Sequence, residues 1–434
     1  MKFKAYTLQN FRNIPQINKL SEEEQFAIEV VGTVLPFMVN NYIIDELINW
    51  DNLPEDPAFI LSFPQKDMLK VKHYEQMAEL IKKQADIREI KKTANKIRMS
   101  LNPNPDGQME HNVPTLGNKK LKGIQHKYNE TALFFPSKGQ TCHAYCTFCF
   151  RWPQFIGISK FKFAEQEADN LIKYLRLHPE VTDVLITGGD PLVMKAKYLR
   201  DIIQKILAAN LNHIKNIRIG TKALSHWPYR FTSDEDAEEL LDVFAMVNKS
   251  GKRLALMVHL SHPRELATKE VKKAIRYIQQ TGTILRSQSP VMKHINDTPK
   301  AWNKMWRKQV QLGIIPYYMF VARDTGAQEY FGVPLVKSWH IFKEAYKNVS
   351  GLARTVRGPS MSADPGKVEV SGISEIEGKK FIALQFIQAR NPDWIKKPFF
   401  AEYDETALWL DDLKPAFSDK FFFEDEFEKM VSQS

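Results

Sequence analysis

Between residues 130 and 348 the sequence repeats one unit, a short apolar run followed by an amphipathic stretch. Strands are expected at Thr131–Phe135, Asp183–Thr187, Ile217–Thr221, Leu254–His259, Thr283–Gln288 and Ile315–Val321, and helices near residues 164–177, 195–208, 234–248, 268–280, 299–311 and 335–348. This alternation is typical of a parallel sheet with right-handed crossovers. Six units predict an α/β fold, a partial (β/α)6 barrel, with reactive groups where the strands end.

The segments on either side follow other patterns. Residues 1–125 predict an N-terminal helical cap, because Ser21–Glu24 fits a capping box and residues 73–100 are charged and helical until a Pro/Asn/Gly-rich breaker at 102–107. Residues 350–434 predict a small C-terminal extension with short strand-like runs. We therefore expect three parts, a cap over 1–125, a barrel over 126–349 and an extension over 350–434.

The composition limits the class of protein. Hydrophobic and charged fractions of 43% and 26% are those of a soluble globular protein. No stretch reaches the roughly eighteen apolar residues of a membrane span, and the N-terminus lacks an apolar signal core. We therefore expect a cytoplasmic protein with no membrane partner. The net charge of +10 comes from lysines spread along the chain. This favours a pocket for anionic ligands over a nucleic-acid partner.

Three cysteines, the only ones in the chain, lie within eight residues at Cys142, Cys146 and Cys149. An odd number of cysteines without an export signal argues against disulfides. Three thiolates are one ligand short of a closed zinc or electron-transfer cluster site. On a [4Fe–4S] cluster they would leave one iron open for chemistry. Zinc completed by a histidine stays an alternative, although His143 lies awkwardly close to Cys142.

The C-x3-C-x2-C spacing, with Phe148 before the third cysteine, resembles that of the radical S-adenosylmethionine (SAM) superfamily, in which the open iron chelates SAM. Further motifs follow in a consistent order: His126–Tyr128, Thr187–Pro191, Arg218–Lys222, His259–Pro263, Ser287–Ser289, Ile295–Asp297 and Pro316–Tyr318. In that order, over residues 120–370, they resemble the lysine 2,3-aminomutase family. The resemblance implies three cofactors, a [4Fe–4S] cluster, SAM and pyridoxal 5′-phosphate (PLP).

The resemblance also implies roles for individual residues. The family holds PLP as a Schiff base with a lysine after a glycine-rich turn, and the matching residue is Lys367, after Gly366. A lysine on such a turn can bond to PLP and yield it to substrate. Arg151 matches the arginine that clamps the substrate carboxylate, a task suited to a guanidinium. The remaining matches are Gly188, Gly189, Asp190, His259 and Gln288 near SAM, and Lys127 and Tyr128 near PLP.

Two departures from the family pattern are informative. The lysine enzymes bind the distal ammonium of their substrate with two aspartates, and these positions fall on Arg323 and Ser360 by spacing. A cation facing an ammonium would repel it, so lysine is a poor substrate candidate. The glutamate branch has a basic and a neutral residue there, which favours an acidic or polar substrate. A shift of one residue would instead place Asp324 or Asp364 in the pocket.

The second departure is that no cysteine remains for the intersubunit zinc of the lysine enzymes, so any homo-oligomer would form without it. The resemblance thus implies an isomerase, an amino-acid 2,3-aminomutase that acts on a small amino acid and takes an electron from a donor such as flavodoxin or ferredoxin. Two alternatives remain, a PLP-independent radical SAM enzyme that modifies another substrate and a zinc-holding basic binding module.

Overall fold

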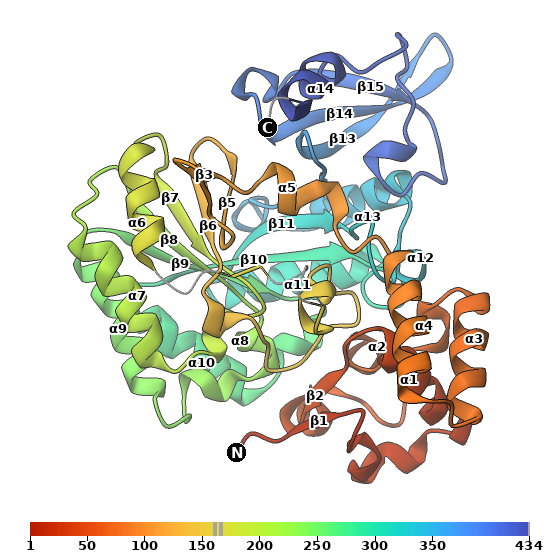
Figure 1. Cartoon of the computed structure of the whole chain (residues 1–434). Coiled ribbons are helices and arrows are strands. Elements are labelled where there is room, and N and C mark those ends of the chain that lie inside the picture. The colour runs from red at the N-terminus through yellow and green to blue at the C-terminus, as the bar shows by residue number, and fades with distance from the viewer. Residues whose placement is uncertain (159–162, 165–167, 433–434) are drawn as a thin grey trace.

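The computed structural model describes residues 1–158, 163–164 and 168–432. Its centre is a sheet of eleven strands among these residues, in the order β15-β14-β13-β12-β11-β10-β9-β8-β7-β6-β5 (Figure 1). The middle of this sheet is parallel: β6 (Thr131–Phe134), β7 (Asp183–Ile186), β8 (Asn216–Thr221), β9 (Arg253–His259), β10 (Ile284–Val291) and β11 (Ile315–Val321). All six predicted strands are therefore confirmed.

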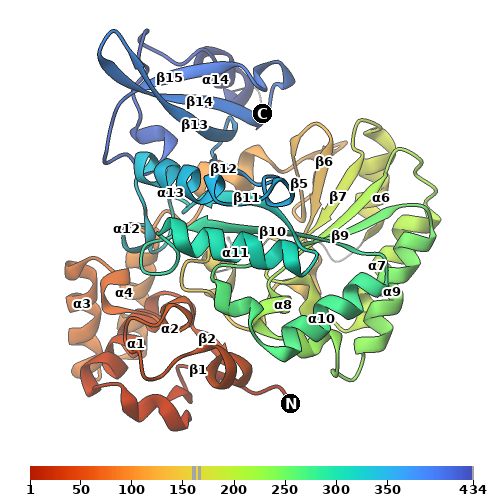
Figure 2. The ribbon, with the colours of Figure 1, turned by 180° about the vertical axis from the view of Figure 1, so that it is seen from behind.

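A helix of ten or more residues follows each of these strands and packs on the outside of the curved sheet (Figure 2). These helices are α6 (Ala168–Leu177), α7 (Ala196–Ala208), α9 (Ala237–Lys249), α10 (Lys269–Gln280), α11 (Pro299–Gln311) and α13 (Leu335–Lys347). Helix α10 illustrates the cause, because its buried residues Val271, Ala274, Ile275 and Ile278 recur at helical spacing. The expected partial barrel of six strand–helix units is confirmed.

Each barrel strand has one face toward the hydrophobic core beneath the helices and the other face toward the barrel interior. On β8, Ile217 and Ile219 are buried in the main hydrophobic core beneath the helices. The residues between and beyond them, Arg218 and Gly220, line an internal cavity instead. Since side chains alternate along a strand, one face stabilises the fold and the other is available for a site.

The sheet extends beyond the six units at both ends. Strand β5 (Ile124–Tyr128) pairs antiparallel with β6, and β12 (Arg357–Ser362) pairs parallel with β11. Strands β13 (Gly366–Ile376), β14 (Lys379–Ala389) and β15 (Pro398–Glu402) follow in antiparallel pairs, and the chain ends in α14 (Glu424–Ser432). The C-terminal segment thus continues the central sheet, while the domain boundaries at 125 and 350 stay predictions.

The two ends of the curved sheet meet. Lys127 Nζ on β5 donates a hydrogen bond to the Ala363 carbonyl, in the turn between β12 and β13. Gln388 Nε2 on β14 donates to Glu130 Oε1, after β5, at 3.1 Å. The hairpin of β5 and β6 therefore lies against the hairpins of the C-terminal segment and covers the side where two more strands would close a full barrel.

The N-terminal segment is largely helical, with α1 (Glu22–Val34), α2 (Pro57–Ser62), α3 (Val71–Lys82) and α4 (Ile87–Met99). The predicted capping box is present, since Ser21 Oγ accepts from Glu24 N and Glu24 Oε2 accepts from Ser21 N. The charged stretch 73–100 forms two helices, because the chain turns between them at Gln84, which has a φ of +51°.

The remaining described α-helices and strands are short: β1 (Ala5–Thr7), β2 (Met38–Asn40), β3 (Thr115–Leu116), β4 (Lys119–Lys120), α5 (Gln108–His111), α8 (Ala223–His226) and α12 (Gln328–Phe331). Within the described part of the chain, no helix combines the length and the apolar character that a membrane crossing requires.

Candidate functional site

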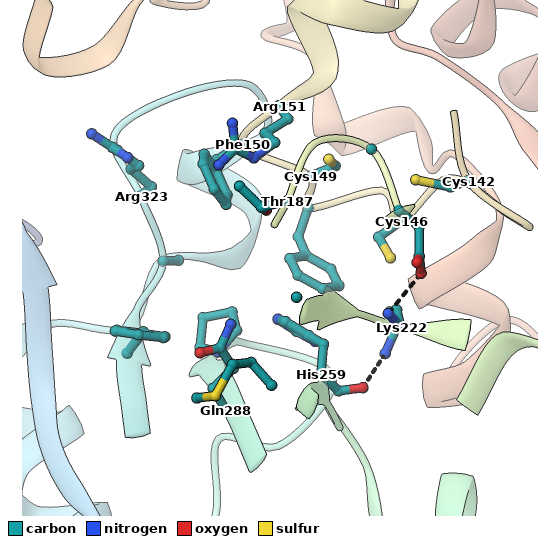
Figure 3. Close-up of a pocket in the computed structure, with 18 of the residues that line it drawn as sticks. Cys142, Cys146, Cys149, Phe150, Arg151, Thr187, Lys222, His259, Gln288 and Arg323 are labelled. Carbon is teal, nitrogen blue, oxygen red and sulfur yellow. Dashed lines mark hydrogen bonds between the residues drawn. The ribbon is translucent and has the colours of Figure 1, made fainter. Parts of the chain in front are cut away.

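A cavity of about 360 Å³ opens at the carboxyl ends of the barrel strands. Its lining draws on the loops after β6, β7 and β11 and on the ends of β8, β9 and β10 (Figure 3). Of the residues selected from the sequence, this lining contains Cys142, Cys146, Cys149, Arg151, Gly188, Gly189, Asp190, His259, Gln288, Arg323 and Lys367. The fold therefore brings together residues that are up to 225 positions apart, from Cys142 to Lys367.

The cysteine loop is held in place by the N-terminal segment. Asn40 Nδ2 donates to the His143 carbonyl at 3.0 Å, and Tyr145 N donates to the Met38 carbonyl at 2.8 Å. Thr147 N donates to the Leu61 carbonyl at 3.1 Å. Because these bonds hold the backbone between the cysteines, the cap positions the thiols as well as covering the barrel.

The glycines after β7 allow the second loop to pack directly against the cysteine loop. A Cβ on Gly189 would lie 2.4 Å from the Thr141 carbonyl oxygen, closer than atoms can approach. Gly188 has a φ of +149°, which favours glycine, and a Cβ there would lie 2.4 Å from Gln140 Nε2. Asp190 N donates to the Thr141 carbonyl at 2.7 Å and fixes the contact.

The side chain of Asp190 fixes the same loop to the next strand. Its carboxylate accepts hydrogen bonds from Thr221 Oγ1 at 2.8 Å, from Lys222 N at 2.8 Å and from Leu192 N at 3.0 Å. Burial raises the pKa of this carboxyl, while these donors lower it. Asp190 thus lies at the cavity wall with its oxygens bound by the Thr221 hydroxyl and by backbone N–H groups, which suits a residue that shapes the loop.

The cysteine environment fits an iron–sulfur cluster. All three thiols line the cavity, and burial raises the pKa of Cys146 to about 12 and that of Cys149 to about 11. Thiolates in such a place need positive charge, which bound iron would supply. The nearby Lys222 and Arg151 already favour the thiolates of Cys146 and Cys149 respectively. Three thiols from one loop are the donor set that leaves one iron open.

His259 is the last residue of β9, and Gln288 lies beside it on β10. The His259 ring stacks on Phe148, between the second and third cysteines, with ring centroids 5.4 Å apart. Burial, followed by the charge of Lys222, lowers the pKa of His259 well below its usual value, so the ring is neutral at neutral pH. These residues form a polar and aromatic wall beside the cysteines, on which a flat ligand could stack.

Lys367 enters the cavity from the opposite side. It is the second residue of β13 and pairs with Ser362 of β12 across a short turn. Its Nζ donates to Gln388 Oε1 at 3.0 Å and lies 4.2 Å from the centre of the Tyr318 ring. Tyr128 lies behind it, with its ring centre 5.8 Å from the amine. Lys127 and Tyr128 therefore adjoin Lys367 without belonging to the cavity lining.

The electrostatics at Lys367 fit the attachment of PLP. Burial and, to a smaller extent, the charges of Arg218, Arg357 and Lys127 together lower the pKa of this amine to about 7. A neutral amine is the form that condenses with an aldehyde. The same three cations are a suitable environment for a phosphate group. The residues present thus fit a buried Schiff-base lysine beside a phosphate.

Two arginines share one end of the cavity. The guanidinium carbon of Arg151 lies 5.0 Å from the centre of the Phe150 ring, and that of Arg323 lies 5.4 Å from it (Figure 3). Burial lowers the pKa of Arg151 to about 10, and Arg323 contributes to the decrease. Arg151 therefore remains cationic at neutral pH, and two guanidinium groups in one pocket favour an anionic ligand.

Three other residues that the sequence connected with the substrate pocket, Ser360, Asp324 and Asp364, lie outside the cavity lining. Ser360 is fully buried on β12 outside the cavity lining, and Ser362, two residues later on the same face, reaches the cavity. Asp364 pairs with Arg390 and accepts from His111, and Asp324 accepts from Asn102 Nδ2 at 2.9 Å. Neither aspartate belongs to the lining, so the described pocket contains Arg323 in place of an acid.

Some lining residues were not selected from the sequence. Lys222 pairs with Glu265 at 2.6 Å beside the cysteines, and the motif Arg218–Lys222 could have indicated it. Phe150 could have been noted as the residue between Cys149 and Arg151. Trp409 is buried in the C-terminal segment and lines the cavity, and its indole N–H lacks a partner among the described residues. No local pattern around Trp409 indicates a site, because only the fold brings it there.

Comparisons with known proteins indicate the family of this chain. The radical SAM superfamily model matches residues 137–299, which include the cysteine loop. A protein of Aquifex aeolicus named putative L-lysine 2,3-aminomutase is 32% identical over 397 residues, 91% of this chain and 92% of its own length. An L-lysine 2,3-aminomutase of Fusobacterium nucleatum is 30% identical over 233 residues, 54% of this chain and 51% of its own.

Among solved structures, Streptococcus suis SuiB bound to the precursor peptide SuiA is similar with a TM-score of 0.35 and 14% identity, over 63% of this chain and 56% of that one. The relative that matches nearly the whole chain, together with the superfamily match over the cysteine loop, decides the assignment. The chain belongs to the radical SAM superfamily, as a divergent member of the lysine 2,3-aminomutase family.

Proposed function

We propose that this radical SAM enzyme is a PLP-dependent amino-acid 2,3-aminomutase, an isomerase that moves an α-amino group to the β-carbon of an acidic or polar amino acid. One observation carries the proposal. The buried amine of Lys367 and the three cysteines line the same cavity, although they come from opposite ends of the central sheet. A radical source and a carrier of amino groups could therefore act on one substrate.

Residues on the two sides of the cavity would bind different cofactors. Cys142, Cys146 and Cys149 would hold the cluster, and Gly188, Gly189, Asp190, His259 and Gln288 would form the SAM side of the cavity. Lys367, Lys127 and Tyr128 would hold PLP on the other side. When bound, SAM on the cluster supplies a carbon radical that removes hydrogen, and PLP carries the amino group and delocalises the unpaired electron.

The protein itself supplies orientation and shelter from water. The neutral amine of Lys367 can form and release a bond to the PLP aldehyde, because its surroundings disfavour the ammonium form. Aromatic residues of the lining, including Phe148, Phe150 and Tyr318, limit the entry of water. Exclusion of water protects a reactive radical from side reactions.

The charge of the pocket supports an acidic substrate. Arg151 could bind the α-carboxylate with two parallel hydrogen bonds, and Arg323, beside the same Phe150 ring, could bind a second carboxylate. Within the described lining Asp190 is the single acid, and its oxygens are committed to Thr221 and Lys222. An ammonium at the far end of a substrate would find no carboxylate partner there.

The experiment is an anaerobic assay of the protein reconstituted with iron, sulfide and PLP, then supplied with SAM and a chemical reductant. Glutamate, aspartate, glutamine and lysine are incubated separately, and the products are separated by chromatography with mass detection. A β-amino isomer of an acidic or amide amino acid, formed without consumption of SAM, supports the proposal. Production of 5′-deoxyadenosine in step with turnover, without any β-amino acid, would favour the PLP-independent alternative.

A further inference from the structure

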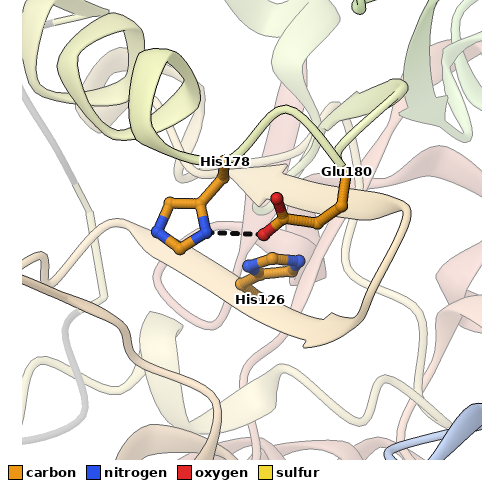
Figure 4. Close-up of side chains that lie close together, drawn as sticks. All are labelled: His126, His178 and Glu180. Carbon is orange, nitrogen blue, oxygen red and sulfur yellow. Dashed lines mark hydrogen bonds and ion pairs between the residues drawn. The ribbon is translucent and has the colours of Figure 1, made fainter.

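A second cluster of metal-ligating side chains lies away from the cavity. His126 belongs to β5, and His178 and Glu180 lie in the turn between α6 and β7 (Figure 4). One ligand atom from each of the three residues lies within 4.8 Å of the others. The turn precedes β7, whereas the cysteine loop follows β6, so the cluster lies at the opposite end of these parallel strands.

The hydrogen bonds of His126 prepare it as a ligand. Its Nε2 lies 3.1 Å from the Asn129 carbonyl, and a carbonyl only accepts, so Nε2 carries the proton. Nδ1 therefore carries the lone pair, which accepts a hydrogen bond from the Tyr174 hydroxyl at 2.6 Å and which a metal ion could take in its place. A ligating imidazole whose other nitrogen donates to a backbone carbonyl is the usual arrangement around protein-bound metals.

His178 and Glu180 complete the set. His178 Nδ1 lies 2.7 Å from Glu180 Oε1, and Figure 4 shows both side chains turned toward the His126 ring. The three residues are half-buried, which allows an ion to enter from solvent. Burial lowers the pKa of His126, so this imidazole is neutral and able to ligate at neutral pH. Two imidazoles and one carboxylate form a ligand set that zinc and related ions accept.

We propose that His126, His178 and Glu180 bind a divalent transition-metal ion of the zinc type, with water in the fourth position and the Tyr174 hydroxyl as an outer partner. The ion would join β5 to the turn before β7. The residues after His126 are Lys127 and Tyr128, which contact the Ala363 carbonyl and adjoin Lys367. The site would thus stabilise the hairpin that covers the open side of the barrel. The inference does not depend on the reaction catalysed in the cavity.

The test measures zinc binding under anaerobic conditions by the reconstituted enzyme, after treatment with a mild chelator. Calorimetric titration with ZnCl2 and elemental analysis give the affinity and the number of ions per chain. The variants are His178→Ala, His126→Ala, the milder His178→Asn, and Tyr174→Phe. His340→Ala is the matched control, because His340 is exposed on α13. A variant with Cys142, Cys146 and Cys149 replaced by alanine separates this site from the cysteines.

The expected result is one zinc ion per chain in the wild-type enzyme, the His340→Ala control and the cysteine variant. His178→Ala, His126→Ala and His178→Asn should weaken binding by more than about 100-fold, beyond the roughly 10- to 100-fold that loss of an outer partner costs. Tyr174→Phe should fall within that smaller range. Circular dichroism melting with and without zinc checks that each variant folds. Equal zinc affinity in the wild-type and the histidine variants, or no zinc on the folded wild-type protein, would overturn the proposal.

Discussion

Lys367 donates a hydrogen bond from Nζ to Gln388 Oε1 at 3.0 Å, across the neighbouring strands β13 and β14. The amide nitrogen of the same Gln388 donates to Glu130, at the start of the barrel. A short chain of hydrogen bonds therefore links the lysine to the far end of the sheet. This chain holds the amine at the cavity wall, where it can meet an incoming aldehyde.

Replacement of that lysine should remove PLP and leave the cluster. In Lys367→Ala the visible absorbance of lysine-bound PLP should disappear, because no other amine in the described lining except Lys222 reaches the cavity, and Lys222 is paired with Glu265. The iron–sulfur absorbance and the iron content should stay unchanged, and turnover should fall below detection. Lys379→Ala is the control, since Lys379 is exposed on β14. An unchanged PLP band in Lys367→Ala would contradict this assignment.

PLP capture should depend on pH with a midpoint near the Lys367 pKa of about 7. The deprotonated amine is the reactive form, so the rate should rise about tenfold per pH unit below the midpoint and level off above it. An ordinary lysine would show a rising rate up to about pH 10.4. Arg357→Met should shift the midpoint upward, because it removes a cation that opposes protonation, while Arg354→Met serves as an exposed control. Stopped-flow absorbance measures the rate of PLP capture at each pH in the wild-type enzyme and in the two variants.

Loss of the second arginine should impair the use of acidic amino acids. Arg323→Met removes a proposed partner of the side-chain carboxylate, and hydrogen bonds to charged groups contribute about 1.5–3 kcal/mol. We expect kcat/KM for the acidic substrate to fall roughly 10- to 150-fold. Arg253→Met, at an exposed residue that begins β9, should have no effect. If Arg323→Met left kcat/KM unchanged, the second carboxylate would have to bind elsewhere.

A methyl group at Gly189 should disturb cluster binding without any change of ligand. In Gly189→Ala the new Cβ would lie 2.4 Å from a backbone oxygen of Thr141, immediately before Cys142. The loops must therefore separate, and the iron content after reconstitution should fall. Gly351→Ala is the control, because no atom lies within 4 Å of the position of its Cβ. Iron analysis and absorbance compare the two, and equal iron in both would show that the loop contact is unimportant.

The sequence predicted the barrel well, since its strands are buried and apolar. The expected strand Leu254–His259 begins one residue earlier in the structure, at Arg253, and ends at the same residue. Strand β5 was not predicted, because Ile124–Tyr128 is half polar and forms the edge of the sheet. The charged run 73–100 gave no sign of the turn at Gln84, since glutamine rarely adopts a positive φ.

The sequence predicted the site residues that lie at the ends of parallel strands. It was less successful for residues whose position depends on the pairing register of two antiparallel strands. The cysteines, Gly189 and His259 lie at strand ends, so their convergence follows from the barrel. Ser360 was selected by its distance in sequence from Lys367, but the register of β12 and β13 brings Ser362 opposite that lysine. Trp409 reaches the cavity through a tertiary contact that no local pattern encodes.

The cysteine loop follows β6 and Lys367 lies on β13, and these two strands belong to one hydrogen-bonded sheet in which they are seven positions apart. Each pair of strands adds a small rotation, and the sum brings the two ends face to face. The distance between the cysteine sulfurs and the Lys367 amine therefore depends on the curvature of the central sheet, to which every strand between β6 and β13 contributes. Substitutions in the outer helices, far from any reacting atom, can consequently alter the rate by changing that distance.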